Sequence, residues 1–79
     1  MSNRPFATHY FAAGSKDPAA KGHAASEEGA IRASVVRVFL RQWVSAEIYE
    51  DGVLIYSVVR HGRTITIHLG RAQLLRSAA

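Results

Sequence analysis

Apolar and polar residues alternate through residues 44–69, VSAEIYEDGVLIYSVVRHGRTITIHL, in three β-rich runs. The dipeptides Asp51-Gly52 and His61-Gly62 separate these runs. Glycine reaches the positive φ that a tight strand reversal requires, so both dipeptides are typical of β-hairpins. The pattern therefore predicts a three-stranded antiparallel meander.

The same pattern predicts how the strands align. A two-residue loop at His61-Gly62 would place Val58 opposite Ile65. A three-residue loop at 50–52, with Gly52 as a bulge, keeps one face apolar throughout, whereas a two-residue loop there would bring Ser45, Glu47 and Tyr49 onto it. The expected apolar face consists of Val44, Ala46, Ile48, Leu54, Tyr56, Val58, Ile65, Ile67 and Leu69. The opposite face, which includes Tyr49 and Ile55, is mixed.

Residues 26–40 favour a helix that covers this sheet. Ser26 is a suitable N-cap, and the two glutamates that follow it suit the positive end of a helix dipole. Apolar residues recur at helical spacing: Ile31, Val35, Val38 and Phe39. The opposite side would carry Ala33, Ser34, Arg37 and Arg41. A strand is the alternative, because Val36, Val38 and Leu40 also alternate.

The remaining segments have weaker patterns. Residues 1–25 lack a sustained period, so we expect a flexible N-terminal arm, and residues 71–79 are at most a short C-terminal helix. The expected fold is α+β, with one helix packed on a three-stranded antiparallel meander in a single domain over 26–79. The expected core is Ile31, Val35, Val38, Phe39, Val44, Ala46, Ile48, Leu54, Tyr56, Val58, Ile65, Ile67 and Leu69.

Length and composition narrow the class of protein. A chain of 79 residues builds one small domain, and the absence of cysteine excludes a disulfide framework and thiolate metal sites. A partner chain or a second copy, as in a homodimer, would then supply the missing stabilisation. No run approaches the roughly 18 apolar residues of a membrane span, and the N-terminus lacks a signal-peptide core. We expect a cytoplasmic protein.

The net charge of +4 comes from the second part of the chain. Residues 31–79 carry Arg32, Arg37, Arg41, Arg60, Arg63, Arg71 and Arg76 against Glu47, Glu50 and Asp51. Arginine makes planar, multidentate contacts with phosphate and carboxylate groups, so an all-arginine set favours a recognition surface. An arginine-rich genome would give the same composition.

Motifs for catalysis are lacking. The chain has no nucleophile elbow, P-loop or dinucleotide-binding glycine motif, and its Glu50-Asp51 pair suits a turn. The four histidines form no i,i+4 or HxH pair, which argues against a metal site. We expect no enzyme activity, no cofactor and no bound metal.

One enzymatic alternative rests on the segment IYSVVRHGRTITI, which resembles the closing sheet of RelE/ParE-type toxins. That resemblance implies RNA cleavage or gyrase poisoning. Arg60, Arg63, His61 and His68 would then supply phosphate contacts and proton transfer, with Tyr49 or Tyr56 nearby.

Direct DNA or RNA binding is a more general alternative. A helix on a three-stranded sheet with arginine at the turns occurs in several small nucleic-acid-binding domains. The segment RQWVSAEIYEDG resembles the first hairpin of plant ethylene-response-factor domains, and the expected element order resembles that of double-stranded-RNA-binding domains.

Protein binding is the leading hypothesis. Apolar and aromatic anchors surrounded by arginine are typical of an interface. In size and character the chain is similar to small proteins of phages and mobile elements, including anti-CRISPR proteins. We therefore expect a small basic inhibitor or adaptor that occupies an acidic protein surface on a nucleic-acid-processing complex. The expected contact residues are Arg37, Arg41, Arg60 and Arg63 for anionic groups, and Tyr49 and Ile55 as apolar anchors.

Overall fold

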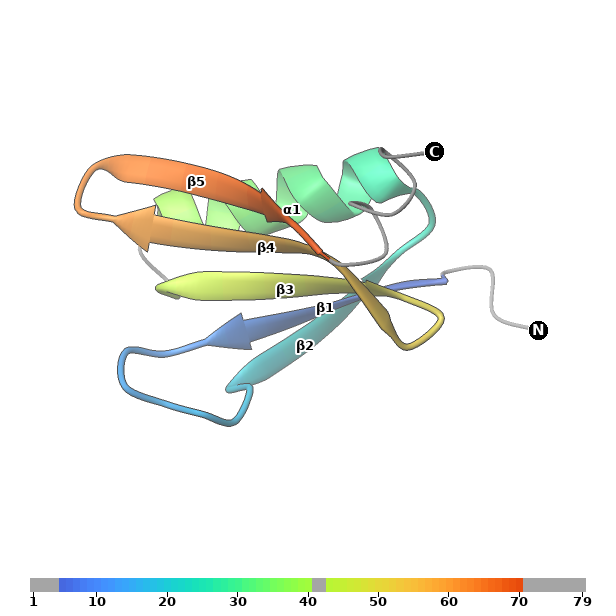
Figure 1. Cartoon of the computed structure of the whole chain (residues 1–79), viewed down its shortest axis with the longest axis horizontal. Helices are drawn as coiled ribbons and strands as arrows, with labels where there is room; N and C mark the ends of the chain where they lie inside the picture. Colours follow the sequence, from blue (N-terminus) through green and yellow to red (C-terminus); the bar gives the residue numbers. More distant parts are fainter. Residues whose placement is uncertain (1–4, 41–42, 71–79) are drawn as a thin grey trace.

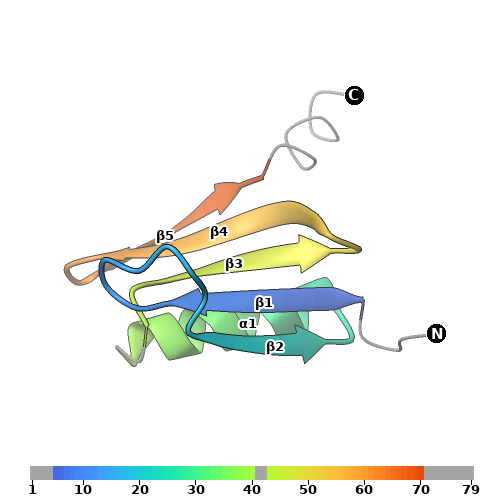
Figure 2. The same ribbon diagram turned by 90° about the horizontal axis from the view of Figure 1, so that it is seen from below.

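The computed structural model describes residues 5–40 and 43–70. Its elements are β1 (Phe6–Phe11), β2 (Ala20–Ala24), α1 (Glu27–Phe39), β3 (Ser45–Glu50), β4 (Val53–His61) and β5 (Thr64–Leu69). The strands form one antiparallel sheet in the order β2-β1-β3-β4-β5, and α1 covers one of its faces (Figure 1 and Figure 2). The α+β class is thus correct, but the expected three-stranded meander is wrong, because the sheet has five strands.

The two additional strands lie in the segment expected to be a flexible arm. Along β1 every second side chain is buried, namely Phe6, Thr8 and Tyr10. This period-two pattern is short, includes a threonine among its inward positions, and is surrounded by small and polar residues. For these reasons the sequence alone did not predict a strand here. β1 lies between β2 and β3 and is antiparallel to both, so β2 and β3 are parallel to each other. The helix α1 connects these two parallel strands by crossing over β1.

The helix is confirmed, and its expected apolar face is partly correct. Val38 is buried as expected, and Ile31 and Val35 pack partly buried against the core, but Phe39 is exposed. The Ser26 hydroxyl caps the helix by accepting a hydrogen bond from the Gly29 N–H at 3.0 Å. Its fully buried residues are Ala30, Ser34 and Val38. The sheet already presents bulky side chains, so the helix approaches it through small residues, and the larger apolar residues lie on the flank.

Ser34 gives a first prediction about stability. Its hydroxyl is buried and has no hydrogen-bond partner among the described residues. Because an unsatisfied buried polar group costs free energy, Ser34→Ala should raise the free energy of unfolding by about 1 kcal/mol. Urea denaturation of both proteins measures this difference, and a loss of stability instead would show that the hydroxyl is satisfied in solution.

Both predicted hairpins are present, but their loops differ from the expected ones. The first loop has two residues, Asp51 and Gly52, with φ of 51° and 82°, and Glu50 pairs with Val53. These two positive φ values are typical of a type I′ turn, so the predicted three-residue loop is wrong. The second loop is Gly62-Arg63, not His61-Gly62, since His61 pairs with Thr64.

A β-bulge explains why most of the predicted apolar face is nevertheless correct. The register of β3 and β4 shifts between Ile48 and Tyr49, which adds a residue inside β4 instead of in the turn. Tyr56 and Val58 therefore remain on the helix side, as expected. The bulge exchanges two other residues: Ile55 is buried in the core, and Leu54 pairs with Tyr49 on the opposite face.

The core lies farther from β5 than the sequence predicts. It consists of Phe6, Tyr10, Ala30, Val38, Ala46, Ile48, Ile55 and Val58. Among the expected core residues, Phe39, Ile67 and Leu69 are exposed. Figure 2 shows the reason, because β5 rises away from α1 toward its C-terminal end. Within the described residues, no helix has the length and apolar character needed to cross a membrane.

Candidate binding surfaces

The structure separates the six residues predicted to contact a partner. Arg41 lies outside the described residues, and Ile55 is only 1% exposed, which removes it as a surface anchor. Tyr49 lies on the sheet face opposite α1, whereas Arg37 lies on α1 with its guanidinium 5.2 Å from the centre of the Tyr10 ring. Among the five members of the predicted set that the structure describes, the fold brings only Arg60 and Arg63 together.

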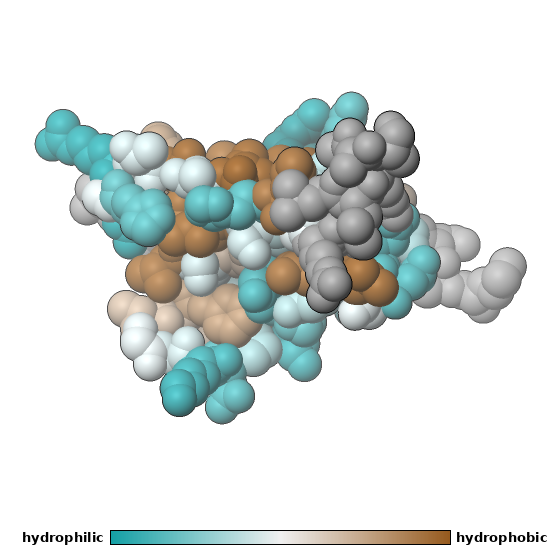
Figure 3. Space-filling model, viewed as in Figure 1, coloured by the Kyte–Doolittle hydropathy of each residue, from teal (hydrophilic) through white to brown (hydrophobic). Residues whose placement is uncertain are grey.

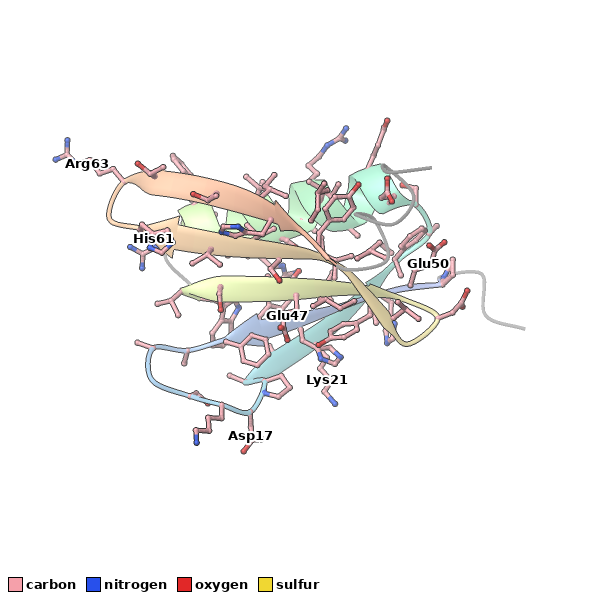
Figure 4. All side chains as sticks on the ribbon, in the orientation of Figure 1. Asp17, Lys21, Glu47, Glu50, His61 and Arg63 are labelled. Carbon is pink, nitrogen blue, oxygen red and sulfur yellow. The ribbon has the colours of Figure 1, made fainter. Side chains whose placement is uncertain are left out.

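Arg60 and Arg63 line a depression of about 420 Å³ between the end of α1 and the start of β5. We refer to this depression as the α1/β5 groove. Its lining residues are Phe39, Arg60, Gly62, Arg63 and Ile65. Figure 4 shows Arg63 projecting from the β4–β5 turn, away from the body of the molecule. The groove thus combines an aromatic ring, an aliphatic side chain and two guanidinium groups.

The Arg60 side chain is incompletely satisfied. Its Nη1 donates to the Gly62 carbonyl at 3.4 Å, which is a long hydrogen bond, and its Nε is buried without a partner among the described residues. A guanidinium group has five N–H donors and favours planar, bidentate acceptors. This arrangement favours a carboxylate as the group that Arg60 would bind.

Exposed apolar side chains extend the groove along β5. Phe39 is 67% exposed, Ile67 45% and Leu69 44%. Ile65, Ile67 and Leu69 share one face of β5, which we call the apolar edge. Figure 3 shows hydrophobic residues reaching the surface along the side of the molecule where β4 and β5 lie. Large apolar side chains that gather at the surface mark interaction sites more often than singly scattered ones do.

The sheet face opposite α1, which we call the open face, has a different chemistry. One cross-strand row, with a residue from each of the five strands, contains Lys21, His9, Glu47, Ser57 and His68. The register places the other two histidines on the same face. Figure 4 shows Glu47 near its centre, with Lys21 and His61 toward its margins. Histidine therefore accumulates on the open face, while Arg37 and Arg60 lie on the helix side.

At the centre of the open face, Tyr49 donates a hydrogen bond to Glu47 Oε1 at 2.9 Å. The His9 ring lies 4.7 Å from the Tyr49 ring. Burial, and then the hydrogen bond to Glu47 and the charge of that carboxylate, raise the pKa of Tyr49 above its ordinary value. A second depression, of about 370 Å³, lies beside this cluster under the β1–β2 loop.

The raised pKa of Tyr49 predicts a pH dependence of stability. The folded protein retains a proton that the unfolded chain loses near pH 10, so this contribution is complete below about pH 10 and is lost at higher pH, as the folded form also ionises. Tyr49→Phe should remove this part of the alkaline loss of stability. Thermal denaturation from about pH 8 to 11 compares the two proteins, and identical profiles would contradict the assignment.

The positions of the histidine, arginine and acidic side chains disfavour the enzymatic alternative. In the described part of the chain, no three histidine or acidic side chains are close enough together to hold a metal ion. Arg60 lies on the helix side of the sheet, and His68 lies on the open face. The residues that the RelE/ParE resemblance would combine for catalysis are therefore divided between two faces.

Comparisons with protein-family models, curated proteins and solved structures gave no match to this chain. Phe39, Ile67 and Leu69 were expected in the core and not at the surface. Phe39 fits the apolar spacing of the helix, and the other two alternate with polar residues along β5. The four histidines of the open face could not be grouped from the sequence, since the register of the strands places them on one face and their spacing along the chain does not.

Proposed function

We propose that this protein is a small non-enzymatic binding module that uses the α1/β5 groove and the apolar edge to occupy an acidic protein surface. The observation that carries the proposal is the exposed Phe39 ring beside Arg60 and Arg63 in one depression. Interfaces commonly place aromatic and aliphatic anchors at their centre with arginine beside them. The role that we propose is that of an inhibitor or adaptor of a nucleic-acid-processing complex, a role also suggested by the similarity to anti-CRISPR proteins.

Charge supports a protein partner that is acidic. The chain is basic, and none of the residues that line the groove is acidic. A partner carboxylate in the groove would accept hydrogen bonds from the guanidinium groups that line it, those of Arg60 and Arg63. Opposite charges of this kind contribute to specificity and association rate more than to affinity.

Direct nucleic-acid binding is a second candidate, and the open face is the observation that favours it. That face presents four histidines and Lys21 around one central carboxylate. Such a surface offers a polyanion several N–H donors and one positive charge. The face lacks arginine among its described residues, and Glu47 at its centre would repel phosphate.

Two titrations distinguish these candidates. Fluorescence anisotropy with labelled duplex DNA and single-stranded RNA, at low and near-physiological salt, should show weak or no binding. Affinity capture from a lysate of the source organism, followed by titration of the purified captured protein, should show binding that persists at near-physiological salt. Tight nucleic-acid binding with a steep salt dependence would contradict the proposal and favour the open face.

A further inference from the structure

We propose that the outer edge of β5 binds an extended acidic segment of the partner as a sixth strand of the sheet. This inference rests on the proposed function and specifies how the α1/β5 groove recognises its partner. Strand addition of this kind draws its affinity from main-chain hydrogen bonds and its specificity from pockets for alternate side chains. The structure supports it through the direction of the β5 backbone, the character of its edge and the charge beside it.

The first step is the direction of the backbone groups in β4. The Arg60 N–H donates to the Val44 carbonyl at 3.1 Å, so the backbone groups of Arg60 point toward β3. Backbone groups of successive residues in a strand point to opposite edges. Val59 and His61 therefore point toward β5, where they pair with Thr66 and Thr64.

The second step follows from this pairing. Thr64 and Thr66 direct their N–H and C=O groups toward β4, so those of Ile65, Ile67 and Leu69 point to the outer edge. The next residue confirms the alternation, because the Gly70 N–H donates back to the Ile55 carbonyl at 2.7 Å. Within the described residues β5 has a neighbour on one side only. Its outward backbone groups thus belong to the same residues whose side chains form the apolar edge.

The two edges of the sheet differ in how well they resist strand addition. β2 is five residues long, contains Lys21 and Gly22, and packs against α1. Short length, lysine and glycine are features that discourage pairing at an edge. β5 has the sequence TITIHL, whose first four residues are all β-branched, and it contains no proline and no formal charge. This edge is suited to pairing with another strand.

The arginines beside β5 indicate what kind of segment would pair with it. A second copy paired edge to edge would bring two more arginines, its own Arg60 and Arg63, to the same interface without a carboxylate from either groove. A partner segment with alternating apolar and acidic residues fits better. Its apolar side chains would pack along the apolar edge toward Phe39, and an acidic side chain near the β4–β5 turn would meet the guanidinium groups.

The test uses a phage-displayed library of linear peptides selected on the whole protein. We expect the selection to yield acidic peptides of high β-propensity that do not bind the Phe39→Asp variant of the protein. In the free protein, the amides of Ile65, Ile67 and Leu69 should exchange faster than those of Thr64 and Thr66. When a peptide binds, exchange at these three amides should slow. N-methylation of alternate peptide residues is the matched control: one set should lower affinity at least tenfold, and the intervening set should have little effect.

Three outcomes would overturn strand addition. In the first, binding depends on Phe39, but hydrogen exchange at those amides is unchanged and N-methylation of the peptide has no effect. This result would leave the groove as the binding surface and exclude a sixth strand. Sedimentation that shows a tight homodimer protected at β5 would assign the edge to a second copy. Selection of peptides that protect only the open face, or of none, would contradict both the inference and the proposed function.

Discussion

Gly70→Ala is expected to cause a large loss of stability, of about 3 kcal/mol. A Cβ at this position would lie 2.9 Å from the backbone carbonyl carbons of Leu54 and Ile55, closer than such atoms pack. Gly70 is buried where the chain leaves β5, and backbone atoms of the bulge cannot rotate away as a side chain can. Forcing extra atoms into such a site costs roughly 1–3 kcal/mol or more.

The loss is large relative to the whole, because a chain of this size is stabilised by roughly 4 to 12 kcal/mol. The melting temperature should fall by more than about 10 °C. Gly22→Ala is the matched control, since its closest contact is the Thr8 hydroxyl, the end of a side chain, and its effect should be smaller. Calorimetry of the three proteins decides, and equal losses would argue against the close approach at the bulge.

Phe39→Asp should weaken partner binding by at least about 30-fold. Phe39 is the most exposed of the large apolar side chains in the described residues, so its replacement should leave the fold nearly unchanged. At the centre of an interface, loss of a buried aromatic anchor costs about 2 kcal/mol or more, and the new carboxylate would also compete for Arg60. Isothermal titration of the captured partner measures the change.

Val53→Asp is the matched control for that substitution. Val53 is 51% exposed and begins β4, at the end of the strand remote from Arg60. Introducing the same charge there should change affinity by less than about threefold, since surface substitutions away from a site have small effects. If both variants bind like the original protein, the α1/β5 groove is not the contact surface.

The hairpins and the helix could be predicted because their signals are local. Glycine at Gly52 and Gly62, and the cap at Ser26, act within a few residues and do not depend on the rest of the fold. The predicted apolar face also survived, although the extra residue lies in a bulge near Ile55 and not in the turn. A bulge and a longer loop have the same effect on which side chains share a face, so the alternation alone cannot separate them.

The five-stranded sheet could not be predicted from the same patterns. β1 is central, but its inward residues Phe6, Thr8 and Tyr10 include one polar side chain, and β2 contains Gly22 and Lys21. Their place depends on pairing with strands far along the chain. Once β1 and β2 are in the sheet, the helix lies over its centre, and β5 lies farther from the core.

That displacement of the core also determined the candidate site. Residues that would be interior in a three-stranded domain, such as Ile67 and Leu69, lie at the margin of a five-stranded one. Tyr49 and Arg60 lie on opposite faces of the sheet, so they cannot belong to one contact surface. Only Arg60 and Arg63, which are close in sequence and belong to one hairpin, could be grouped correctly from the chain alone.

The most direct test of the central claim is a hydrogen-exchange footprint of the protein with its captured partner. If the α1/β5 groove and the apolar edge are the contact surface, exchange should slow over 60–69 and the C-terminal half of α1, and remain unchanged over β1 and β3. Slowing confined to β1 and β3 would place the partner on the open face and contradict the account.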